Sequence, residues 1–196
     1  MTAQIPDGIR YDGHSYAIAA IERDWPFDPN ALGLRKGCTI LFSTGCYRGF
    51  EAGYEVRDGF LFLVRLSVLY NSNRTPPSWN GLEPRLRTNY PDMWEYPELR
   101  YPIDYSGGLI IGRGFLQEFY VHMGFQRPHC YEVVHELVFE HGWLRQATDH
   151  SLRMEFAREL IRSGHAEWAG VDLSRDDVGR FIDDTFSLSY EKKWPR

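Results

Sequence analysis

Apolar side chains alternate most clearly over residues 60–70, FLFLVRLSVLY. On an extended strand, the alternation places six of them on a single face: Phe60, Phe62, Val64, Leu66, Val68 and Tyr70. The other face starts apolar with Leu61 and Leu63, and then carries Arg65 and Ser67 before Leu69. Such a strand is expected to be covered on both sides for half of its length and open on one side for the rest.

Turn signals separate further runs in which apolar side chains alternate in the same way. Asp12-Gly13 and Asp58-Gly59 each stand between two strand-like runs, and Asp-Gly adopts the positive φ angles of a type I′ hairpin turn at low steric cost. His141-Gly142 is a third candidate turn. Residues 1–70 and 103–146 are therefore predicted to be mainly β, although residues 116–123 also fit a short helix.

Residues 71–102 interrupt this pattern. They contain six of the chain's 11 prolines and show no periodicity. Frequent prolines prevent both a helix and a central strand, so the segment is predicted to be a long loop, and loops of this length in compact domains are usually functional or disordered. Its aromatic residues indicate that most of it is ordered: Trp79, Tyr90, Trp94, Tyr96 and Tyr101.

The last fifty residues have a helical pattern. Leu152, Phe156 and Leu160 recur every four residues, and Ala157 and Ile161 widen that face. A second stripe follows: Val178, Phe181, Ile182 and Phe186. Strands followed by helices indicate an α+β fold. We expect a mainly antiparallel sheet or sandwich in residues 1–146, with two C-terminal helices in residues 147–196 packed on it.

Charge and cysteine usage narrow the function classes. The net charge is −5 without a block of Lys or Arg, which argues against nucleic-acid binding. The three cysteines form no CxxC pair, which is typical of a reducing compartment. The start of the chain lacks the pattern of a signal peptide, and no run is long and apolar enough for a membrane span. The expected location is the cytoplasm.

Cys46 is the first candidate for chemistry, within FSTGCYRGFEAGYEV. A nucleophilic cysteine needs a lowered pKa, usually from a histidine or a helix N-terminus. The residues that follow Cys46 read as a strand and offer no helix dipole. Gly45, Gly49 and Gly53 instead favour a tight corner in which Cys46 is a small buried residue.

Metal and phosphate sites are not predicted either. His129, His135 and His141 are spaced six apart, so in an extended strand the outer two would lie roughly 40 Å from each other. No HxH, HExxH or CxxC motif is present, and GGLIIGRG lacks the Lys-Ser or Lys-Thr of a phosphate-binding loop. We therefore expect no cofactor, no metal and no catalytic residue.

Three blocks of the sequence, STGCYRGF, YSGG and YVHMGF, resemble a family of uncharacterised bacterial proteins. Members carry Ser-Thr-Ala-Cys-Trp-Arg-Gly-Tyr followed by a Trp-Glu-Ile strand, then Trp-x-Ser-Gly, then Tyr-Val-His-Met-Gly-Tyr, in the same order over roughly residues 9–145 of this chain. This chain departs from the pattern at four positions: Gly45 replaces alanine, and Tyr47, Tyr54 and Tyr105 replace tryptophan. The resemblance implies a bacterial, cytoplasmic, β-rich fold and an association with toxin–immunity genes.

The function expected from these observations is protein binding, as in an immunity-type inhibitor of a bacterial toxin. Trp, Tyr and Arg are enriched at binding hot spots, and the long loop supplies the predicted contacts: Trp79, Arg85, Arg87, Tyr90 and Trp94. The alternative is a small-molecule-binding protein or enzyme with a pocket around Cys46, Arg48 and His122. For Arg48, Glu55 is one expected partner. The sequence does not predict an oligomeric state.

Overall fold

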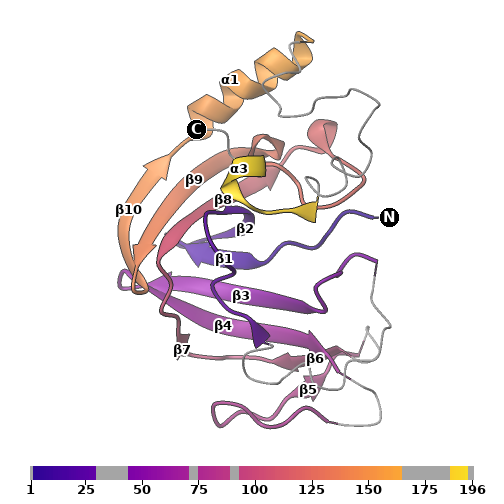
Figure 1. The fold of residues 1–196 in the computed structure, drawn as a ribbon, viewed down its shortest axis with the longest axis vertical. Helices are drawn as coiled ribbons and strands as arrows, with labels where there is room; N and C mark the ends of the chain where they lie inside the picture. Colours follow the sequence, from indigo (N-terminus) through magenta and orange to yellow (C-terminus); the bar gives the residue numbers. More distant parts are fainter. Residues whose placement is uncertain (1, 30–43, 71–74, 89–92, 165–185, 194–196) are drawn as a thin grey trace.

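A computed structural model describes residues 2–29, 44–70, 75–88, 93–164 and 186–193 (Figure 1). Within these residues, ten strands form one sheet in the order β10-β9-β8-β2-β1-β3-β4-β6-β5, with β7 paired to β4. The strands are β1 (Gly8–Tyr11), β2 (His14–Ile21), β3 (Phe50–Arg57), β4 (Phe60–Leu69), β5 (Arg85–Leu86), β6 (Met93–Tyr96), β7 (Tyr101–Pro102), β8 (Gly107–Phe115), β9 (Tyr131–Glu140) and β10 (Trp143–Asp149).

The sheet curves until β10, at one end of the strand order, reaches the start of β4 (Figure 1). Trp143 of β10 pairs with Phe60 of β4, so that the strands from β10 to β4 enclose the main core. That core draws on β1, β2, β3, β4, β8 and β9, with fully buried side chains such as Ile9, Ile18, Tyr54, Leu63 and Leu109. The predicted α+β, mainly antiparallel architecture is confirmed. Among the described strands, one pairing is parallel, between β1 and β3.

Tight turns form where the sequence predicted them. Asp12 and Gly13 have φ angles of 48° and 72°, and Asp58 and Gly59 have 51° and 76°. His141-Gly142 repeats the geometry at 49° and 79°. Two successive positive φ angles are typical of the type I′ turn, so local sequence determines these three hairpins.

The predicted assignment of side chains in residues 60–70 to two faces is wrong, because the strand contains a bulge. Gly53 pairs with Arg65 while Tyr54 pairs with Leu63, so Val64 is an extra residue in β4. A bulge of this kind shifts the alternation by one position. Leu61 and Leu63 are therefore buried before the bulge, and Leu66 is buried after it.

The predicted loop 71–102 is also partly wrong, because it contains β5, β6 and β7. Strand β6 pairs with the second half of β4, from Leu66 to Leu69. The predicted loop therefore supplies the neighbouring strand for the second half of β4. Pro102 lies in the two-residue strand β7, a short edge segment where the lack of a proline N–H is tolerated.

The helical C-terminal region begins later than the predicted residue 147, since β10 continues to Asp149. Helix α1 (Ser151–Arg162) follows, and a short helix, α3 (Tyr190–Lys193), lies near the C-terminus. Most of the second predicted helix falls in residues 165–185, outside the described residues. None of the described helices has the length and apolar run needed to cross a membrane.

The predicted apolar face of α1 is wrong for two of its residues. Leu152 and Phe156 are 81% and 61% exposed, whereas Met154, Ala157 and Arg158 are buried. The small side chain of Ala157 lets the helix approach β9 and the 3₁₀ turn Pro128–Cys130. Arg158 Nη1 donates a 2.8 Å hydrogen bond to the carbonyl of Tyr131, and this bond satisfies the buried guanidinium.

Candidate functional site

The corner that carries Cys46 is held by the N-terminal segment. The Gln4 side chain donates to the carbonyl of Thr44 at 2.8 Å and accepts from the backbone N–H of Tyr47 at 2.8 Å. The backbone N–H of Ile5 donates to the carbonyl of Gly45, also at 2.8 Å. These bonds satisfy the polar backbone of the turn, as expected for a structural corner.

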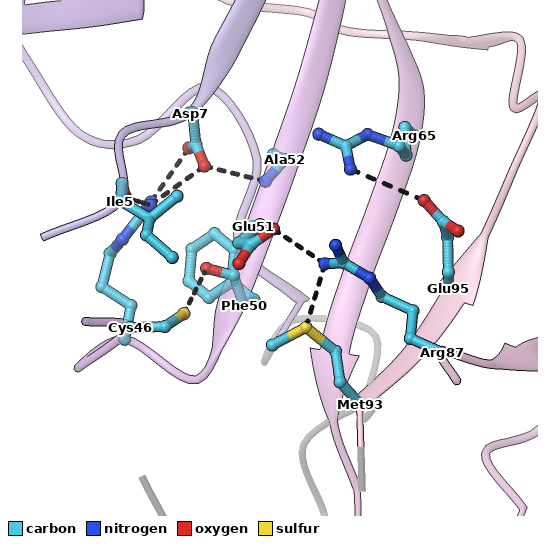
Figure 2. Close-up of polar contacts among 11 residues, drawn as sticks. Ile5, Asp7, Cys46, Phe50, Glu51, Ala52, Arg65, Arg87, Met93 and Glu95 are labelled. Carbon is cyan, nitrogen blue, oxygen red and sulfur yellow. Dashed lines mark hydrogen bonds and ion pairs between the residues drawn. The ribbon is translucent and has the colours of Figure 1, made fainter. Parts of the chain in front are cut away.

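Arg48 forms the central ion pair of this region. Its guanidinium donates to both carboxylate oxygens of Asp7, at 2.9 and 3.0 Å, and to the carbonyl of Ile5 at 3.3 Å. Asp7 is completely buried and also accepts a 2.8 Å bond from the backbone N–H of Ala52 in β3, as Figure 2 shows. The predicted pairing of Arg48 with Glu55 is wrong, because Glu55 pairs with Arg57 at 2.6 Å.

Aromatic rings complete the surroundings of Arg48. The guanidinium carbon lies 4.0 Å from the ring centre of Trp25, 4.7 Å from that of Phe50 and 5.5 Å from that of Phe125. Such cation–π contacts stabilise a partly desolvated arginine. Arg48 therefore joins the N-terminal segment, β3 and two loops, and its hydrogen bonds are directed at the protein itself.

Cys46 is buried beside this ion pair. Its thiol donates to the carbonyl of Phe50 at 3.3 Å. Burial, followed by the negative charge of Glu51, raises the pKa of this thiol. Burial also raises the pKa of Cys130, to about 11. Both thiols are therefore protonated at neutral pH, which is the opposite of what a nucleophile needs.

This state of the thiols predicts slow alkylation. In the folded protein at pH 7, Cys46 and Cys130 should react with iodoacetamide at least about tenfold more slowly than glutathione, because the thiolate is the reacting form. Peptide mass spectrometry separates these two sites from Cys38. In urea all sites should react equally fast. Labelling of native Cys46 at the rate of glutathione would contradict a structural role.

His122 does not join Cys46 and Arg48 through any contact between described residues. Its side chain is exposed, and its Nδ1 lies 3.2 Å from the hydroxyl of Tyr120. No group of three or more metal-ligating side chains occurs among the described residues. Burial lowers the pKa of His129 to about 4, so that histidine is neutral at pH 7.

The predicted partner-binding residues separate into two groups. Trp79 packs on the rings of Phe27 and Tyr101, with centres 5.4 and 5.1 Å away, and is half-buried. Trp94 in β6 also packs against the core. Tyr90 lies outside the described residues. The tryptophans therefore stabilise the domain, and the two arginines remain as candidate contacts.

Arg85 lies in β5, and Arg87 follows directly after this strand. Strand β5 is the last one in the described strand order. Arg85 is exposed. Arg87 Nη1 contacts Glu51 at 3.1 Å and the sulfur of Met93 at 3.3 Å, as drawn in Figure 2. Between them Leu86 is 53% exposed. Sequence reasoning missed Leu86, although a leucine between two arginines in a proline-rich segment was a usable signal.

Comparisons with known proteins return no relative: no family model, no curated protein and no solved structure matches this chain. The resemblance carried by STGCYRGF, YSGG and YVHMGF therefore stays a prediction.

Proposed function

We propose that this chain is a non-catalytic protein-binding protein whose partner contacts the hairpin of β5 and β6. The observation that carries the proposal is the exposure of Leu86 at the end of the sheet. In the part of the chain that the structure describes, β5 pairs only with β6, and no described strand lies along its other edge. Sheet edges are common docking sites for another polypeptide, and the exposed leucine would offer that polypeptide an apolar contact.

The proposed partner is basic, as in an immunity-type inhibitor that blocks a bacterial toxin domain. The net charge of −5 would attract a basic domain over long range and raise the association rate. The exposed carboxylate of Glu83, two residues before β5, contributes to this attraction. Leu86 would then supply the apolar contact at the centre.

A pocket around Cys46, Arg48 and His122 is less well supported. Arg48 is occupied by Asp7 and by the carbonyl of Ile5. The Cys46 thiol is buried and directed at a carbonyl. An anionic substrate would have to displace a fully buried carboxylate to reach this arginine.

The test begins with affinity purification from the organism that encodes the chain, followed by recombinant production of the identified partner. Leu86→Ser and Arg85→Ala should each weaken the measured affinity about 10-fold or more, as hot-spot substitutions do. Leu152→Ser is the matched control, because Leu152 is an exposed leucine on α1. It should leave the affinity unchanged.

Two outcomes would contradict the proposal. The first is equal affinity of the Leu86→Ser variant and the parent protein for the partner. The second is a homodimer in size-exclusion chromatography that Leu86→Ser dissociates, since the open edge of β5 would then bind a second copy of this chain.

A further inference from the structure

A cleft of about 860 Å³ lies over β1, β3 and β4, and its described lining contains none of the predicted partner-binding residues. Among the described residues, four arginines line it: Arg10, Arg57, Arg65 and Arg100. They come from three strands and from the segment between β6 and β7. In the same described lining only two carboxylates occur, Glu55 and Glu98, so the cleft is positive on a chain whose net charge is −5.

Two glycines keep the floor of the cleft open. Gly8 of β1 pairs with Gly53 of β3, and both line the cleft. A Cβ atom on Gly53 would lie 3.2 Å from Cβ of Arg65 and 3.5 Å from its Nε. Glycine at this position therefore gives the Arg65 side chain room to lie across the strand.

The wall formed by residues 97–100 is anchored to the sheet. Leu99 is buried in the core, and its backbone N–H donates to the carbonyl of Val64 at 2.9 Å. Val64 is the extra residue of the bulge in β4. Next to it Glu98 has a φ angle of 57°, a strained conformation that persists when the surroundings hold it. Arg100 is thereby held at the rim on a fixed segment.

The guanidinium groups have hydrogen-bonding capacity to spare. Arg10 Nη1 lies 3.9 Å from Oε1 of Glu55, and the other oxygen of that carboxylate accepts a hydrogen bond from Arg57. Arg65 lies 3.5 Å from Glu95, as Figure 2 shows. Arg100 makes no hydrogen bond or ion pair with any described residue. Each guanidinium carries five N–H donors arranged to match a carboxylate or a phosphate.

We propose that this cleft binds a small polyanion with two or more carboxylate or phosphate groups. Its volume is in the range of small-molecule sites, and converging arginines bind such groups in pairs of charge-assisted hydrogen bonds. The ligand would lie over Gly8 and Gly53, with one anionic group at Arg65 and Arg100 and the other at Arg10. This inference does not depend on the proposed protein partner.

Isothermal titration calorimetry with citrate and with pyrophosphate, in low-salt buffer, tests the proposal. At least one of them should bind saturably with a Kd below about 1 mM, and sodium chloride at matched ionic strength should give no saturable heat. Arg65→Gln and Arg100→Gln should each weaken binding about tenfold. Citrate binding alone assigns a polycarboxylate, and pyrophosphate binding alone assigns a phosphate compound.

Arg162→Gln is the matched control, because Arg162 is an exposed arginine paired with Glu118 at the end of α1, far from β4 in Figure 1. It should bind like the parent protein, and so should Leu86→Ser, which separates this site from the partner hairpin. Thermal unfolding of each variant verifies its fold. Absence of saturable binding by both anions, or equal loss in Arg162→Gln and Arg100→Gln, would overturn the proposal.

Discussion

Replacing Asp7 by alanine is expected to destabilise the protein by about 3–5 kcal/mol, the range for breaking one side of a buried ion pair. The substitution leaves Arg48 desolvated among the rings of Trp25 and Phe50 without its bidentate partner. It also removes the acceptor for the backbone N–H of Ala52. Three segments that meet at this carboxylate would lose their common contact.

Urea unfolding followed by tryptophan fluorescence measures the change. The matched control is Glu140→Ala, which breaks the pair between Glu140 and Arg145 in which both side chains are more than half exposed. The free energy of unfolding of that variant should fall by less than about 1 kcal/mol. Asp7→Ala and Arg48→Ala should also be strongly non-additive in a double-mutant cycle. A loss below about 1 kcal/mol for Asp7→Ala would show that the pair does not hold the fold.

Replacing Gly142 by alanine should destabilise the protein by about 3 kcal/mol or more, by combining backbone strain with overpacking. Gly142 has a φ angle of 79°, which favours glycine. An added Cβ would also overlap the backbone oxygen of Ile103 and lie 2.5 Å from Cζ of Phe60. The backbone oxygen of Ile103 cannot move away easily, because the N–H of Ile103 is bound to the carbonyl of Leu61 and the N–H of Gly142 to that of Tyr105.

Gly59→Ala is a closely matched control for this prediction. Gly59 occupies the same position of a type I′ turn, with a φ angle of 76°, but no described atom outside the turn lies within 4 Å of the place a Cβ would take. Gly59→Ala should therefore lower the free energy of unfolding by about 1–2 kcal/mol, from backbone strain alone. Chemical denaturation of both variants gives the difference. Equal losses would mean that the close approach at Gly142 has no energetic weight.

The sequence predicted those features that depend on neighbouring residues. The three hairpin turns follow from Asp12-Gly13, Asp58-Gly59 and His141-Gly142, because a positive φ angle is a local property. The glycines around Cys46 likewise predicted a structural corner with a small buried thiol, and the structure places Cys46 in such an environment.

Tertiary structure decided the features that depend on distant residues. Asp7 reaches Arg48 across 41 positions of the chain, and the bulge at Val64 that reverses the faces of β4 is visible only in its pairing with β3. Packing on β9 selected Ala157 rather than Phe156 for the buried side of α1. The arginines of the cleft come from positions 10, 57, 65 and 100. Local periodicity carries no information about which strands become neighbours, because that choice follows from burying apolar surface in one shared core.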